Sequence, residues 1–166
     1  MRRLMSIITA VKLIGSALVV IGGAAMAYNL NARAKRALSI TEGLINLIRH
    51  VKTQVSCYAT PIDKILSGCE KSVFEACGYA KEATPQSIGE LIEGCPMLEG
   101  RALGVMNEFS RGFGKSYRAD QVRLCESSIE ELSALRSDIS DKLPIRRKLN
   151  STLCISSAMA IVILLA

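Results

Sequence analysis

Two charge-free apolar runs, one near each end of the chain, constrain its fold more than any other feature. They cover residues 13–30 and 149–166, and each holds 18 residues without Asp, Glu, Lys or Arg. As helices they would be ~27 Å long, which is adequate for a bilayer core of ~30 Å. Both runs are apolar all round a helix, which favours membrane spans over buried core helices. We therefore expect a membrane anchor over residues 1–30, a soluble domain over 31–148 and a transmembrane helix over 149–166.

The positive charge of the chain borders these runs. The whole chain is +6, yet residues 37–145 hold 12 basic and 15 acidic side chains and sum to −3. By the positive-inside rule, basic residues on the side of the central domain predict that this domain is cytoplasmic and that both termini lie outside. Three basic residues at the N-terminal end oppose this orientation: Arg2, Arg3 and Lys12. Those that favour it are Arg33, Lys35, Arg36, Arg146, Arg147 and Lys148.

An alternative interpretation of the N-terminus is a signal peptide. The basic start, the apolar stretch and Ala25-Met26-Ala27 resemble a leader with its cleavage site. Cleavage there would produce an exported, membrane-anchored extracytoplasmic helical domain. Against it, the basic cluster at 33–36 follows directly and opposes translocation. Nucleic-acid binding is disfavoured, because the excess of positive charge is confined to the membrane flanks and only 4% of the residues are aromatic.

The middle of the chain has the periodicity of helices. Residues 37–55 carry apolar or small side chains alternately three and four apart, and no Pro lies between residues 13 and 60, so one helix is expected to continue out of the first run. Thr60-Pro61 and Thr84-Pro85 each predict the start of a short helix, with Thr as N-cap and Pro as first residue.

Three more helices complete this pattern. A short one is expected around Phe74 and another over residues 98–109. A long one is expected over 122–143, and Pro144 kinks its approach to the second run. The apolar stripe of this long helix follows a three-four repeat and comprises Val122, Cys125, Ile129, Leu132, Ile139 and Leu143. No stretch alternates as a strand would. The predicted fold is all-α: an antiparallel helical domain flanked by N- and C-terminal transmembrane helices.

The sequence offers little for catalysis. The six cysteines form no CxxC pair and there is a single histidine, His50, so we expect buried small side chains rather than a metal site. Gly114-Lys115-Ser116 lacks the preceding Gly of a P-loop, because that position is Phe109. We expect no catalytic, cofactor-binding or metal-binding residues, no small-molecule substrate and no enzymatic activity.

Several short motifs, taken in order, resemble one family. They are Lys12-Leu13-Ile14-Gly15, Tyr58-Ala59-Thr60-Pro61, Gly114-Lys115-Ser116, Asp120-Gln121 and the final run 160–165. With this layout the chain resembles the stage III sporulation protein AB family of endospore-forming bacteria over nearly its whole length.

The resemblance implies a fold and a function. The fold would be similar to the cytoplasmic domain of the platform protein of type II secretion and type IV pilus machines. The function would be that of a membrane platform or adaptor in a secretion-like complex between mother cell and forespore, required for endospore development. It would sit in the mother-cell membrane, with a secretion-type ATPase among its partners. Candidate contact residues on the last helices are Arg111, Arg118 and Arg123.

Overall fold

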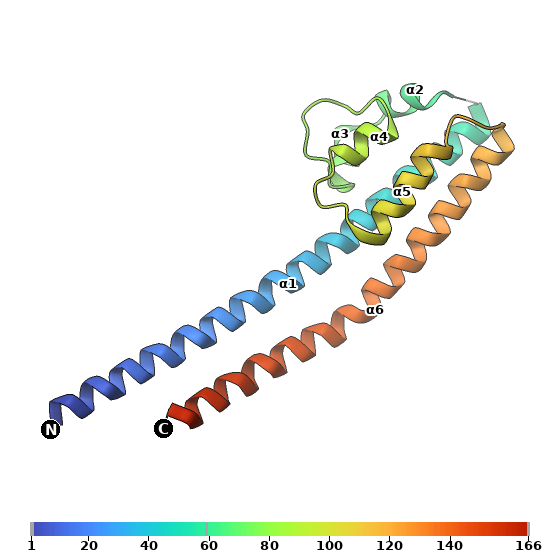
Figure 1. Cartoon of the computed structure of the whole chain (residues 1–166). Helices are drawn as coiled ribbons and strands as arrows, with labels where there is room; N and C mark the ends of the chain where they lie inside the picture. The colour runs from blue at the N-terminus through green and yellow to red at the C-terminus, as the bar shows by residue number, and fades with distance from the viewer. Residues whose placement is uncertain (1, 59, 166) are drawn as a thin grey trace. The chain divides into compact units, whose positions relative to one another are not determined.

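The computed structural model describes the backbone of residues 2–58 and 60–165, and most side chains between residues 21 and 145. Within these residues the chain is helical and contains no strand, so the all-α prediction is confirmed (Figure 1). The helices are α1 (Arg2–Tyr58), α2 (Ile62–Ser67), α3 (Lys71–Ala76), α4 (Ile88–Glu93), α5 (Gly100–Gly112) and α6 (Arg118–Leu165).

The chain divides into two compact units. The terminal unit comprises Met1–Lys35 and Asp141–Ala166, and the central unit comprises Arg36–Ser140. The central unit holds the second half of α1, the four shorter helices and the first half of α6. Its core contains apolar side chains from α1 to α6, among them Leu44, Leu66, Leu91, Phe109 and Leu132.

Helix α1 is continuous, as the absence of Pro predicted, and it is buried on more than one side. The predicted stripe is confirmed at Thr41, Leu44, Ile48, Val51 and Val55, all of which are buried. Ile40, Ile45 and Leu47 are buried as well, which widens the covered surface beyond one stripe. The additional cover includes α3, because a Cβ atom placed on Gly43 would lie 2.6 Å from the carbonyl carbon of Ala76. In the central unit α1 is therefore the central element of the core.

Helix α6 runs antiparallel to α1 within the central unit. Glu42 of α1 pairs with Arg136 of α6 at 2.7 Å, and Lys52 pairs with Glu126 at 2.7 Å. From the first pair to the second, the residue number in α1 rises by ten while the residue number in α6 falls by ten. This relation is expected of two antiparallel helices that lie side by side in constant register. The deepest positions of α6 are Cys125, Ser128 and Leu132, spaced three and four apart. The predicted stripe contained Ile129, but the buried position is the preceding residue, Ser128. At this point the prediction was therefore wrong by one residue.

Two predicted helix starts were wrong. Pro61, and not Thr60, is the N-cap of α2, and it caps without a side-chain hydrogen bond. Helix α4 starts after Ser87 rather than at Thr84-Pro85: the Ser87 hydroxyl accepts a hydrogen bond from the Glu90 N–H, and the Glu90 carboxylate accepts one from the Gln86 N–H. This is a variant of the capping box Ser-x-x-Glu, a signal that the sequence carried.

The segment between α3 and α4 is not helical, but hydrogen bonds and close packing fix its conformation. The Ala80 N–H donates to the Gly94 carbonyl at 2.8 Å, and the Tyr79 hydroxyl donates to the Ala83 carbonyl at 2.9 Å. Gly94 lies against the Tyr79 ring so closely that any side chain there would overlap it. Gly78 takes a φ of 85°, a left-handed conformation that suits Gly and ends α3 sharply.

The two apolar runs lie within α1 and α6, and most of their side chains fall outside those that the structure describes. Across the part that is described, no helix offers a stretch long and apolar enough for a membrane crossing. Pro144 lies inside α6 and does not end it. The predicted domain boundaries at residues 30 and 148, and the transmembrane helices, stay predictions.

Candidate functional site

The predicted contact residues lie at the hairpin between α5 and α6. Arg111 is in the last turn of α5, Arg118 is the first residue of α6, and residues 113–117 connect them. All three arginines are exposed, and the Arg123 side chain lies 4.0 Å from the Asp120 carboxylate. Arg118 and Arg123 are five residues apart, so they point about 140° apart around the helix. The hairpin brings the arginines to one end of the central unit, but they do not form one flat patch.

Two exposed tyrosines accompany them. Tyr117, directly before α6, is 86% exposed, and Tyr58, the last residue of α1, is 73% exposed. Because α1 and α6 are antiparallel and in register, the end of α1 and the start of α6 belong to the same end of the central unit (Figure 1). Exposed Tyr beside Arg is typical of protein interaction surfaces. Sequence reasoning used Tyr58 only as part of a family motif and proposed neither tyrosine as a contact residue, because neither belongs to a periodic pattern.

The membrane-flanking basic residues separate into two groups. Lys35 and Lys148 line one cavity of the terminal unit, together with Tyr28, Asn31, Ala32, Leu143 and Pro144. Its volume is about 810 Å³. Arg33 and Arg36 are exposed and do not line it. Arg146 and Arg147 lie in α6, and their side chains are outside those that the structure describes.

The α1 wall of this cavity follows from helix geometry. Tyr28, Asn31, Ala32 and Lys35 are spaced by three, one and three residues, which places them on one face of α1. Leu143, Pro144 and Lys148 form the α6 wall. The i, i+3, i+4, i+7 spacing from Tyr28 to Lys35 was the sequence signal for this face, but the sequence did not show which side of α6 it meets.

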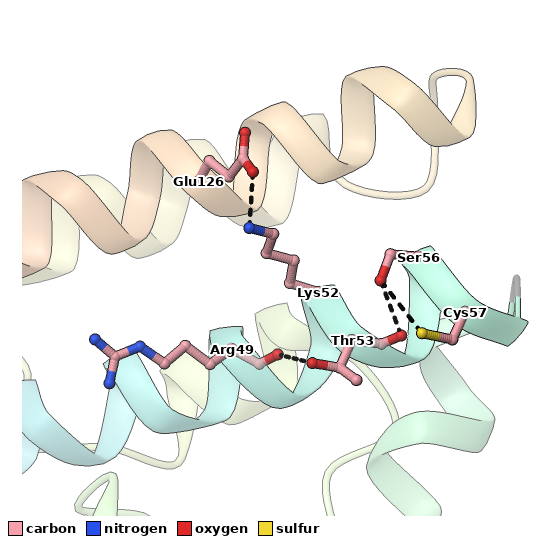
Figure 2. Close-up of polar contacts among 6 residues, drawn as sticks. All are labelled: Arg49, Lys52, Thr53, Ser56, Cys57 and Glu126. Atoms are coloured by element: carbon pink, nitrogen blue, oxygen red, sulfur yellow. Dashed lines mark hydrogen bonds and ion pairs between the residues drawn. The ribbon is translucent and has the colours of Figure 1, made fainter.

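A second, smaller hollow of about 460 Å³ lies between α1 and α6 in the central unit. Figure 2 shows Lys52 reaching across from α1 to Glu126, while the guanidinium of Arg49 points away from that pair. The hydroxyls of Thr53 and Ser56 donate to backbone carbonyls one turn earlier on α1, at 3.0 and 3.1 Å. These hydroxyls are engaged by their own helix, so this hollow is a polar seam of the helix pair.

The cysteines of the central unit are mostly shielded. The expectation of buried small side chains is confirmed for Cys77, Cys95 and Cys125. It was wrong for Cys57, which is exposed, while Cys69 is partly buried. The side chain of Cys154 lies outside those that the structure describes. Burial raises the pKa of the Cys77 thiol to about 12 and those of Cys95 and Cys125 to about 11. Nucleophilic cysteines instead have lowered pKa values and partial exposure, so these three thiols are inert at neutral pH.

The described side chains contain no group of three or more His, Cys, Asp or Glu residues that could hold a metal ion. Gly114-Lys115-Ser116 forms part of the α5–α6 connection, where the Ser116 carbonyl accepts a hydrogen bond from the Gln121 side chain at 2.8 Å. A helix precedes the motif, in place of the strand that a P-loop requires.

Comparison with known proteins gives one match. A family model described as stage III sporulation protein AB matches residues 12–166. The search of curated proteins found no match, and the search of solved structures found none either.

Proposed function

The chain belongs to the stage III sporulation protein AB family, and we propose that it is a non-enzymatic platform subunit of a secretion-like complex between mother cell and forespore. The match covers the motifs on which the resemblance rests, from Lys12 to the C-terminus. Membership implies a role in stage III of sporulation and contact with other sporulation proteins. The platform role, the membrane and the ATPase partner are our proposal.

The observation that carries the proposal is the path of α1 and α6. Each is a single helix that joins one apolar run of the sequence to the packed central unit. A domain whose first and last helices both continue into apolar segments is suited to being held at a membrane surface by two anchors. The pairs Glu42–Arg136 and Lys52–Glu126 join the two helices inside the central unit. The unit would therefore present its surface to partners as one firm body.

The proposal assigns no catalytic step to the chain. The buried thiols of Cys77, Cys95 and Cys125 have raised pKa values, and such thiols are typical of a packed core. The proposal also includes a likeness between the central unit and the cytoplasmic domain of secretion platform proteins.

Topology can be tested with Cys57, which is exposed and close to the end of α1. In our proposal the central unit lies in the mother-cell cytoplasm, because six basic residues border it. A membrane-impermeant maleimide should label Cys57 in permeabilised cells but not in intact cells. C57S is the control that measures labelling of the remaining cysteines, of which Cys69 is partly buried. Labelling of intact cells would instead support the exported domain that follows cleavage after Ala27.

The partner surface can be tested at the α5–α6 hairpin. R118E/R123E reverses two exposed charges in the first two turns of α6. A carboxylate at residue 118 interacts favourably with the helix dipole, and the exposed Arg123–Asp120 pair that is lost contributes little, so the fold should not suffer. K71E/R101E is the matched control, since both residues are exposed and lie in the first turns of α3 and α5. We expect R118E/R123E, and not the control, to reduce heat-resistant spore yield and capture of the complex's ATPase. Equal behaviour of the two variants would refute this surface.

A further inference from the structure

The cavity of the terminal unit has the features of a phosphate site with an apolar wall. Two lysines, Lys35 and Lys148, line it from different helices, and no carboxylate is among its described lining residues. Neither lysine forms an ion pair within the described part of the chain. Two like charges around one hollow repel each other unless an anion lies between them. The electrostatics therefore favour an anionic ligand.

The remaining lining selects among anions. Ala32, Leu143 and Pro144 offer carbon surface, and Pro144 has no N–H to donate. Tyr28 and Asn31 add an aromatic ring, a hydroxyl and an amide. This wall suits alkyl carbons attached to the anion better than it suits a free inorganic ion. The volume of about 810 Å³ is ample for a phosphate with its glycerol and the first acyl carbons.

The position of the cavity along the sequence points to a lipid. Tyr28 belongs to the first apolar run and Lys35 to the basic cluster that follows it. Lys35 follows Tyr28 by seven positions, a helical rise of about 10 Å, which is enough to cross one headgroup layer of roughly 5–8 Å. Tyr is enriched at this boundary, and basic pockets between helices on the cytoplasmic side bind anionic headgroups.

We propose that this cavity binds the phosphate headgroup of one anionic phospholipid, with Lys35 and Lys148 on opposite sides of the phosphate. The inference rests on the proposed membrane location of the chain. It adds a specific lipid-binding site formed by the two lysines, whereas the positive-inside rule requires only that basic residues lie near the membrane.

The test uses the full-length chain purified in a neutral detergent, whose micelles have no surface charge. Trace phosphatidylglycerol is added, and native mass spectrometry measures the lipid bound per chain. We expect one phosphatidylglycerol to be retained, and phosphatidylethanolamine to be retained far less. K35Q/K148Q should weaken retention by about 30-fold, about fivefold for each lysine. A32F, which places an aromatic ring in the cavity wall without changing the charge, should also weaken retention.

The matched control is R33Q/R36Q, which removes two cations of the same cluster that do not line the cavity. It should weaken retention less than threefold. An equal loss of phosphatidylglycerol retention in the two double variants would refute the specific site and indicate non-specific electrostatic attraction instead. Glycerol 3-phosphate or inorganic phosphate is added in a second arm. Displacement of the lipid by either at similar concentration would show a free phosphate compound to be the ligand, against the proposal.

Failure of this inference is distinguishable from failure of the proposed function. If Cys57 is protected in intact cells but the chain retains no phosphatidylglycerol, the lipid site is wrong and the platform role stands. If Cys57 is labelled in intact cells, the orientation behind both proposals is wrong.

Discussion

The packing of α3 on Gly43 predicts an unusual cost for the smallest possible substitution. A Cβ atom at residue 43 would lie 2.6 Å from the Ala76 carbonyl carbon and 2.9 Å from the Cys77 backbone nitrogen. Carbon atoms in contact normally lie ~3.5–4.0 Å apart. G43A therefore needs the backbone at the end of α3 to move by about 1 Å. Overpacking of this kind costs ~1–3 kcal/mol, and the obstacle is backbone, which yields less easily than a side-chain end.

G104A is the matched control. Gly104 also lies inside a helix, α5, but a Cβ atom there would meet nothing within 4 Å. Both substitutions gain the same helix propensity, about 1 kcal/mol, so the difference between the two variants isolates the overpacking. We expect G104A to be slightly more stable than the parent chain and G43A to be about 2 kcal/mol less stable than G104A.

Thermal unfolding of the full-length chain, followed by far-UV circular dichroism in detergent, measures this difference. For a chain of this size about 2 kcal/mol corresponds to a Tm roughly 4–8 °C lower in G43A than in G104A. A local readout complements it. Displacement of α3 should expose Cys77, whose thiol is buried in the parent chain, and increase its labelling rate in G43A only. Equal Tm values for the two variants, with Cys77 unreactive in both, would refute the close approach of α1 and α3.

Three further predictions concern charge and capping. The pKa values of Cys77, Cys95 and Cys125 in the folded chain lie above the ordinary 9.0, so the folded chain binds these thiol protons more tightly than the unfolded chain does. The resulting contribution to the free energy of unfolding is fully present below pH 9 and is lost as the pH rises towards 11–12. The Tm should accordingly fall between pH 8.5 and about 10.5, less steeply in C125A, and a constant Tm would contradict the burial of these thiols. A double-mutant cycle with E42Q and R136Q should give a coupling of ~0.2–1 kcal/mol that decreases in high salt, because both side chains are about half exposed; a coupling near zero at low salt would show that this pair does not join α1 to α6. S87A should lower the stability by ~1 kcal/mol through loss of the α4 cap, whereas T84A should have little effect, and the opposite order in thermal unfolding would restore Thr84 as the helix start.

The long helices were predictable because their signals are redundant. In α1 a stripe of apolar residues and the absence of Pro indicate the same helix, and the buried Leu44, Ile48 and Val51 confirm it. The displaced stripe in α6 has a specific cause. The seam passes over Ser128, which is buried although polar, while the more apolar Ile129 is only partly buried against the core. Apolar periodicity alone favours Ile129 as the buried residue. It takes no account of side-chain size, and a small residue such as Ser128 allows two helices to pack closely.

The short helices were less predictable for a different physical reason. Helices of six residues such as α2, α3 and α4 are too short to be stable alone, so tertiary contacts decide where they begin. Thr84-Pro85 has the local form of a helix start, but Pro85 is buried in the core and the helix begins only after Ser87.

The cavity of the terminal unit could not be predicted either, because it also depends on tertiary contacts. Each lysine was identified as a membrane-flanking charge, yet only the pairing of α1 with α6 places Lys35 and Lys148 around one hollow. What distinguishes them from Arg33 and Arg36 is the helix face on which they lie, and that is why the two double variants provide the decisive comparison.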